Sequence, residues 1–261
     1  RLKKSKNAQK IVFSIPNKKR EKKLYTHLKS IGANVYLGDE KDVLDRYYRT
    51  AKKFSAKNII RVTGDCPLVD PHLVDKMIIF FKKNKYDYIS NIIKPTYPDG
   101  MDLEIFSFKA LKNAWIKAKR QDHREHVTRF LLEDKKVKKF NISNKIDYSN
   151  IRWTLDEPID YRVLKKIYNH FKPKIYFSWK NALDYCLKNK KILINKHLVR
   201  NVPKKSSSNN LWITAINKIS GGNSMISKHP DIFLPNRWPT YFKKTKGCTI
   251  WDLDGKKYFD L

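Results

Sequence analysis

Cysteine and long apolar runs are both scarce in this chain of 261 residues. The three cysteines, Cys66, Cys186 and Cys248, lie far apart and lack CxxC spacing, which argues against a disulfide framework and against a zinc site. We expect all three to be small buried residues. No run of about 18 uncharged apolar residues occurs, and residues 1–7 lack the apolar stretch of a secretory signal. The sequence therefore predicts a cytoplasmic protein with no membrane contact.

Acidic residues are also few, with 25 Asp and Glu against 57 Lys and Arg and a formal net charge of +32. A charge of this size attracts polyanions, so nucleic acid must be considered as a partner. The lysines are spread over every segment, however, and no recognition motif accompanies them. We interpret them as solvated faces and disfavour nucleic acid as a partner. The 41% hydrophobic content is enough for one sizeable core and a second, partial domain.

Short apolar runs alternate with helical patterns through the first half of the chain. Buried parallel strands are predicted over 10–15, 34–37 and 58–63, and another strand over 86–90. Apolar residues at helical spacing predict helices over 18–30, 41–54, 73–81, 107–119 and 156–170. This order predicts the α/β class, with a doubly wound, mostly parallel sheet whose ligands lie beyond the C-terminal ends of the strands.

Two aspartates stand where apolar segments end. Asp65 follows Gly64 directly after a predicted strand, and Asp156 follows the apolar approach at 152–155. Magnesium bound to a nucleotide takes one or two protein carboxylates, with water and phosphate oxygens completing its shell. The alternatives are that Asp65 caps the turn before Pro67 and that Asp156 is the N-cap of the helix that follows. If the two strand ends are neighbours in the sheet, both carboxylates could share one metal ion.

Four ordered motifs narrow these alternatives. They are 38–47 (GDEKDVLDRY), 61–68 (RVTGDCPL), 124–128 (REHVT) and 153–158 (WTLDEP). Together they resemble the spore coat polysaccharide type of cytidylyltransferase, which is related to the CMP-KDO and acylneuraminate cytidylyltransferases, over residues 1–201. The resemblance implies a nucleotide-diphospho-sugar transferase (GT-A-like) fold. It also implies Mg²⁺-dependent transfer of CMP from CTP to a sugar, with release of pyrophosphate, for surface polysaccharide biosynthesis.

The resemblance also implies roles for individual residues. It implies that Asp65 and Asp156 bind the metal. It also implies that Arg61 and Arg124 neutralise charge at the reacting phosphate and that His126 is a further catalytic residue. The nucleotide side comprises Asp45, Arg46, Thr63 and Gly64, and the sugar side comprises Asp99, Gly100, Asp102 and Glu125. His126 has a neutral core role as its alternative. Of Asp102 and Glu104, we expect only one to face the pocket and prefer Asp102.

The resemblance has limits at both ends of the sequence. In this family a strand and a Gly- and Arg-containing phosphate loop would precede Arg1, so we expect the chain as given to be an inactive fragment. Residues 202–210 form an expected linker. Residues 211–261 resemble the opening of class III aminotransferases of the glutamate-1-semialdehyde aminomutase type, whose pyridoxal-phosphate lysine would lie in a missing part. Taken alone, 251–255 is typical of an ordinary hairpin with a tight Asp-Gly turn.

Two further functions remain alternatives at this point. A GT-A-like glycosyltransferase also uses an Asp-held metal at a strand end but does not release pyrophosphate from CTP. The hypothesis of a basic nucleic-acid-binding module is supported by the net charge alone. A homodimer is compatible with the leading interpretation.

Overall fold

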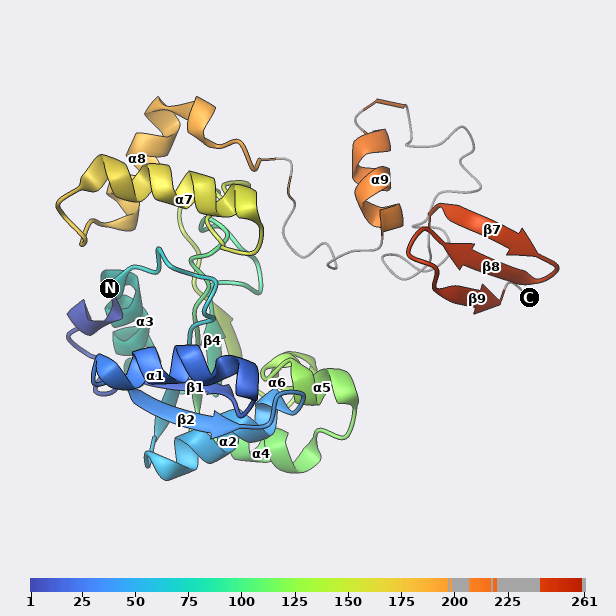
Figure 1. Ribbon diagram of the computed structural model, residues 1–261. Helices are drawn as coiled ribbons and strands as arrows, with labels where there is room; N and C mark the ends of the chain where they lie inside the picture. Colours follow the sequence, from blue (N-terminus) through green and yellow to red (C-terminus); the bar gives the residue numbers. More distant parts are fainter. Residues whose placement is uncertain (197, 199–206, 217, 220–239, 260–261) are drawn as a thin grey trace. The chain divides into compact units, whose positions relative to one another are not determined.

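A computed structural model describes residues 1–196, 198, 207–216, 218–219 and 240–259. The chain forms two compact units, Arg1–Leu198 and Val199–Leu261 (Figure 1). In the part that the structure describes, no helix is both long enough and apolar enough to cross a membrane.

The first unit is built on a mixed sheet. Its strands are β3 (Asn58–Arg61), β5 (Glu104–Ser107), β4 (Tyr88–Ser90) and β6 (Lys139–Asn141), in that spatial order. Strand β5 is antiparallel to β3 and to β4, whereas β4 and β6 are parallel. Strands β1 (Val12–Pro16) and β2 (Asn34–Gly38) form a separate parallel pair. Only β5 therefore runs against its sheet, and the predicted α/β class with a mostly parallel sheet is confirmed.

Helices connect these strands. They are α1 (Lys22–Ser30), α2 (Val43–Lys53), α3 (Pro71–Lys83), α4 (Phe108–Lys117), α5 (Gln121–Glu125), α6 (Arg129–Glu133), α7 (Pro158–Phe171) and α8 (Trp179–Lys188). All five predicted helices are present. Side-chain capping explains the starts of α2 and α4, where Asp42 accepts a hydrogen bond from the Asp45 N–H and Ser107 accepts one from the Ala110 N–H. The expectation that Asp156 caps α7 is wrong, because Glu157 occupies the N-cap position and Pro158 begins the helix.

The core lies on both faces of the sheet. Successive side chains of a strand point to opposite faces, so Tyr88 and Phe106 pack on one side while Ile89 and Ile105 pack on the other. Helices α2, α4 and α6 cover the first face, and α3, α7 and α8 cover the second. This double covering is what a mostly parallel sheet requires.

The cysteines follow the prediction in two cases out of three. Cys66 and Cys186 are buried and free, as expected. Cys248 is exposed, so its predicted burial is wrong. The reason is local: it follows Gly247, which has φ +57° in the turn between two strands of the second unit.

The second unit contains α9 (Ser207–Ile216) and an antiparallel sheet of β7 (Phe242–Lys246), β8 (Thr249–Asp252) and β9 (Lys257–Phe259). The expected Asp-Gly hairpin is confirmed, with Gly255 at φ +82° and its N–H donating to the Asp252 carbonyl at 3.1 Å. Helix α9 begins inside the expected linker 202–210, of which 202–206 lies outside the described residues. The segment 220–239, which contributed to the aminotransferase resemblance, also lies outside them.

Candidate active site

The loop after β3 carries the first acid of the site. The Cys66 N–H donates to the Thr63 carbonyl at 3.2 Å, which turns the chain at the exposed Gly64 and presents Asp65. Beneath it, the Cys66 thiol lies 3.2 Å from the Thr63 hydroxyl and 3.6 Å from the Asp65 carboxylate. Burial raises the pKa of this thiol to about 12, and the charges of Asp65 and Asp102 add to the shift. Asp65 and Asp102 therefore flank the same buried sulfur.

A second loop, around Asp99 and Gly100, is joined to the segment 151–156 by backbone contacts. The Asp99 N–H donates to the Ile151 carbonyl at 2.8 Å, and the Trp153 N–H donates to the Asp99 carbonyl at 2.6 Å. Gly100 has φ +96°, and a Cβ there would meet the Thr154 nitrogen at 2.5 Å. Only glycine allows the loop to approach this closely.

The same segment also contacts the β3 loop. The Leu155 N–H donates to the Asp65 carbonyl at 2.8 Å, and the Thr154 hydroxyl donates to the same oxygen at 3.3 Å. Segment 151–156 thus lies between the loop of Asp65 and the loop of Asp99. The structure places the chain around Asp65 beside the chain around Asp156, as the two acid positions in the sequence suggested.

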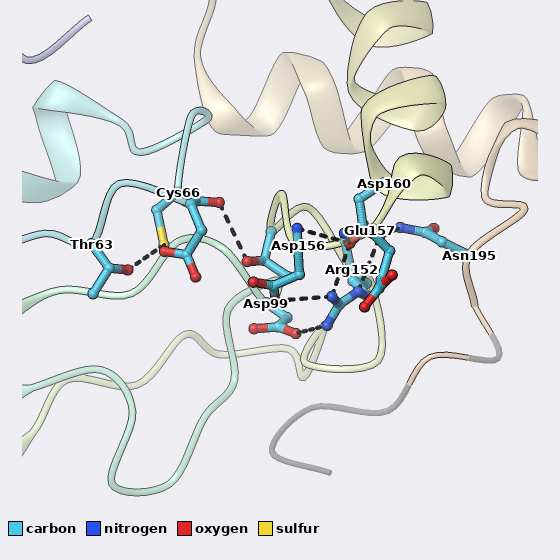
Figure 2. Close-up of polar contacts among 10 residues, drawn as sticks. Thr63, Cys66, Asp99, Arg152, Asp156, Glu157, Asp160 and Asn195 are labelled. Carbon is cyan, nitrogen blue, oxygen red and sulfur yellow. Dashed lines mark hydrogen bonds and ion pairs between the residues drawn. The ribbon is translucent and has the colours of Figure 1, made fainter. Parts of the chain in front are cut away.

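Arg152 lies at the centre of this arrangement (Figure 2). Its guanidinium donates to Asp99 at 3.3 Å, to Asp156 at 3.1 Å, and to Asp160 at 3.0 and 2.9 Å. The Arg152 side chain is only 10% exposed. Burial alone would lower its pKa, but hydrogen bonds and charge from Asp160 and its neighbours outweigh burial and raise it.

Asp160 anchors the guanidinium from the first turn of α7. Its carboxylate accepts the N–H groups of Asp156 and Glu157 at 3.1 and 2.9 Å, and the Asn195 amide at 2.8 Å. Burial would raise the pKa of Asp160, but the hydrogen bonds from Arg152, Asn195 and the two backbone groups lower it. Asp160 therefore stays ionised at neutral pH, which helps to fix Arg152 in place.

We define the acid cluster as Asp65, Asp99, Asp102, Asp156 and Asp160. Five carboxylates thus lie around these loops in a chain whose net charge is +32, and Arg152 pairs with three of them. The side chain of Asp156 is 24% exposed, whereas that of Asp160 is fully buried. Partly exposed carboxylate oxygens fit Mg²⁺, which keeps several waters and takes one or two carboxylates.

The predicted nucleotide-side residues Asp45 and Arg46 lie on α2, outside the acid cluster. Asp45 accepts hydrogen bonds from the Trp115 indole at 2.8 Å and from Arg49 at 2.6 Å. Arg46 is buried and donates to the Asp39 carbonyl at the end of β2. Both side chains thus help to hold α2 against its neighbours.

Arg61 belongs to a buried polar network at the end of β3. It pairs with Glu104, which also accepts the Tyr88 hydroxyl at 2.6 Å, and its guanidinium lies over the ring of Tyr47 from α2. Glu104 is 2% exposed and Arg61 is 22% exposed. Burial works to lower the pKa of Arg61, but the charges of Glu104 and Tyr47 and the hydrogen bond to Glu104 together outweigh burial and raise the pKa. Arg61 therefore joins the α2 side of the sheet to the loop that carries Asp65.

Arg124 is held in a similar way. Its guanidinium donates to Asp42 at 2.8 and 2.5 Å and to the Trp115 carbonyl at 2.8 Å, so it ties α5 to the start of α2. Glu125 and His126 are both exposed. The alternative that His126 is a core histidine is therefore wrong. The buried histidine of this segment is His123.

His123 belongs to an ion-pair network. Among the described residues, ligand atoms of Asp122, His123 and Glu133 lie within 4.8 Å of one another, as in a metal site. Arg120 and Arg129 each pair with both of the acids. Two guanidiniums thus already balance two carboxylates, and we interpret this group as a surface salt-bridge network.

Sequence reasoning missed several residues of the site. Arg152 lies at the centre of the site, yet the sequence predicted a role only for residues that follow it in 153–158. No functional role was predicted for the buried residues Asp160, Asn195 and Glu104 either. The available signal was the excess of aspartates around a single arginine at 152–160. No sequence signal marks Asn195, because it is 35 residues away from Asp160 in the sequence and only the fold brings the two side chains into contact.

A doubly covered, mostly parallel sheet with an acid cluster among its loops is typical of α/β folds that bind nucleotides. The family model described as "Cytidylyltransferase" matches residues 1–191, and the chain belongs to that family.

Relatives and a solved structure agree with this assignment. The chain is 36% identical over 211 residues to an uncharacterized protein of Methanocaldococcus jannaschii, covering 79% of this chain and 83% of that protein. It is 30% identical over 169 residues to the spore coat polysaccharide biosynthesis protein SpsF of Bacillus subtilis, covering 62% of this chain and 68% of that protein. The structure of a cytidylyltransferase from Leptospira borgpetersenii superposes with a TM-score of 0.72 at 30% identity, covering 77% and 85% of the two chains.

Proposed function

We propose that this protein transfers CMP from CTP to a sugar, with Mg²⁺ as cofactor, in the synthesis of a surface polysaccharide. The observation that carries the proposal is the acid cluster, in which the segments of Asp65 and Asp156 are hydrogen-bonded to each other. Membership of the cytidylyltransferase family and similarity to a spore coat polysaccharide biosynthesis protein support it.

In the proposed reaction a hydroxyl or carboxylate oxygen of the sugar forms a bond to the α-phosphorus of CTP. The bond from that phosphorus to the bridging oxygen of pyrophosphate breaks, and pyrophosphate leaves. A hydroxyl nucleophile gives its proton to solvent, whereas a carboxylate has none to give. Little covalent chemistry is left for the protein, so its contribution is placement and charge stabilisation.

The acid cluster would hold the metal and the sugar on adjoining loops. Asp65 and Asp156 are the proposed metal ligands, and when bound the metal supplies charge neutralisation at the phosphate oxygens. Thr63 and Gly64 stand beside Asp65 in the β3 loop, where Gly64 leaves the backbone accessible to a phosphate. Asp99 and Asp102 are the proposed acceptors for sugar hydroxyls.

The nucleotide side lies toward α2, where Asp45 and Arg46 are located. Arg61 links that side to the β3 loop and is the proposed cation for the reacting phosphate. Arg124 holds α5 against α2 and is the second proposed cation. The exposed Glu125 and His126 that follow are proposed to face the sugar side.

The test is a pyrophosphate-release assay with CTP, Mg²⁺ and a panel of acidic and deoxy sugars. Because residues 1–261 by themselves are expected to be inactive, the assayed protein carries the N-terminal strand and phosphate loop of a related enzyme before Arg1. We expect release that depends on one or a few sugars, prefers CTP over UTP, ATP and GTP, and is lost in Asp65→Asn. Asp184→Asn is the matched control, because Asp184 is an exposed aspartate in α8 that pairs only with a neighbouring lysine in its own helix. A folded protein that consumes no CTP with any sugar would refute the proposal. Sugar transfer from a nucleotide sugar without pyrophosphate release would point to a glycosyltransferase.

For the second unit we infer kinship with the opening strands of class III aminotransferases, supported by the resemblance at 247–261, which spans β8 and β9. The cofactor lysine of those enzymes is expected outside 211–261. Added pyridoxal phosphate should therefore give no stoichiometric visible absorbance band, and a stoichiometric band that survives dialysis would contradict this inference.

A further inference from the structure

Arg152 contacts three carboxylates that come from two parts of the chain, the Asp99 loop and the segment 156–160. Asp99 belongs to the proposed sugar-side loop, Asp156 is a proposed metal ligand, and Asp160 lies in the first turn of α7. The distances of 2.9 to 3.3 Å are hydrogen-bond distances for each partner. One guanidinium therefore fixes the spacing between the two functional carboxylates.

Hydrogen bonds to Asp160 and Asn195 fix the position of Arg152. Asp160 accepts two of its hydrogen bonds, and the Asn195 amide donates both to Asp160 at 2.8 Å and to the Arg152 carbonyl at 3.1 Å. Asn195 is 1% exposed and lies beyond residues 1–191, where the family match ends. Side chain and backbone of Arg152 are thus both fixed before any ligand binds.

We propose that Arg152 is a positioning residue that orients Asp156 for the divalent cation and holds Asp99 at a fixed distance from it. The proposal rests on the proposed function, since it takes Asp156 to be a metal ligand. Replacing a residue that hydrogen-bonds to a metal ligand and orients it typically weakens metal affinity by about ten- to a hundredfold.

Arginine is suited to this task and lysine is not. The guanidinium is planar and presents five N–H groups, so it can contact three carboxylates at once in a fixed geometry. An ammonium group is a compact charge on a flexible stem and cannot maintain the same three directions. Arg152→Lys therefore keeps the charge and removes the orientation.

Charge and orientation predict opposite results when Arg152 is made neutral. Arg152→Gln removes a positive charge next to the cation, so electrostatics alone would tighten cation binding. Loss of orientation would weaken it. A purely structural role would lower the melting temperature and leave the affinity of the folded protein for the cation unchanged.

The experiment measures binding of Mn²⁺, as a probe for Mg²⁺, by electron paramagnetic resonance of the free ion. The proteins are the full-length wild type, Arg152→Lys, Arg152→Gln, Asp156→Asn and the control Arg129→Gln. Arg129 is a suitable control because it also pairs with two carboxylates, Asp122 and Glu133, but on the surface. Circular dichroism confirms that each variant is folded, and Arg152→Lys carries the test if Arg152→Gln does not fold.

We expect Asp156→Asn to lose the tight site and both Arg152 variants to bind Mn²⁺ at least about tenfold more weakly than the wild type. Arg129→Gln should bind as the wild type does. If the folded Arg152→Gln binds as tightly as the wild type or more tightly, or if Arg152→Lys is unchanged, the positioning role is overturned while the metal site stands. If wild type and Asp156→Asn do not differ, the proposed metal site itself is overturned and the role of Arg152 with it.

Discussion

Replacement of Gly100 by alanine tests how closely the loops of the site are joined. Gly100 has φ +96°, and a Cβ at this position would lie 2.5 Å from the Thr154 nitrogen and 2.5 Å from the Trp153 carbonyl carbon. Real Cβ atoms do not approach backbone atoms this closely, so the Asp99 loop must move away from segment 151–156. That movement breaks the pair of backbone hydrogen bonds between Asp99 and its neighbours.

The expected loss of stability has two parts. A non-glycine residue at positive φ costs about 1 to 3 kcal/mol, and forcing an extra carbon into a packed site costs about 1 to 3 kcal/mol more. For a unit of this size each kcal/mol lowers the melting temperature by roughly 2 to 4 °C. We therefore expect Gly100→Ala to melt on the order of 10 °C below the wild type in thermal unfolding followed by circular dichroism.

Two other glycines separate these contributions. Gly32 has φ +70° with open space around its Cβ direction, so Gly32→Ala should show only the backbone strain, about 1 kcal/mol. Gly64 has neither a positive φ nor a close neighbour, and Gly64→Ala should stay within about 0.5 kcal/mol of the wild type. If Gly100→Ala is as stable as Gly64→Ala, the close approach of the two loops is wrong.

Other predictions concern buried groups. Glu104→Gln should destabilise the protein by about 3 kcal/mol in urea unfolding, because it leaves Arg61 without its buried counter-charge, while Tyr88→Phe should cost about 1 kcal/mol; equal effects would contradict the network. Iodoacetamide at pH 8 should modify Cys248 and spare Cys66 in peptide mapping, since the buried thiol has its pKa raised to about 12. The stability that Cys66 contributes is fully present below its ordinary pKa of 9.0 and is lost as the pH rises toward 12, so Cys66→Ser should flatten the alkaline loss of stability; an unchanged slope would refute this.

The sequence predicted the elements that periodicity determines. Helix α2 is amphipathic and begins after Asp42, and β1, β2 and β3 are apolar runs that end near Gly or Pro, so each was found within a few residues. Strand β6 was missed because Lys139 to Asn141 is only three residues long and contains a single apolar residue, and its pairing with β4 defines it as a strand. Helix α8 was missed although its apolar positions pack against the core, since flanking polar residues dilute the pattern.

Within the site, four of the five acids could be predicted from the sequence, but Asp160 and the partners of these acids could not. Asp65 and Asp156 stand out because each follows an apolar segment, and the structure puts their segments side by side. The preference for Asp102 over Glu104 had a weak basis, because residues two apart in a strand face the same side. Tertiary structure distinguishes Glu104 from Asp102, because Glu104 begins β5 and pairs with Arg61, a residue 43 positions earlier in the sequence.

The most direct test of the central claim is phosphorus NMR of CTP incubated with Mg²⁺, the sugar panel and the protein that carries a related enzyme's N-terminal strand and phosphate loop before Arg1. We predict pyrophosphate and a CMP-linked sugar in equal amounts with the wild type and with Asp184→Asn, and neither product with Asp156→Asn. Unchanged CTP with every sugar in the presence of folded wild-type protein, or equal product from Asp156→Asn, would contradict the account.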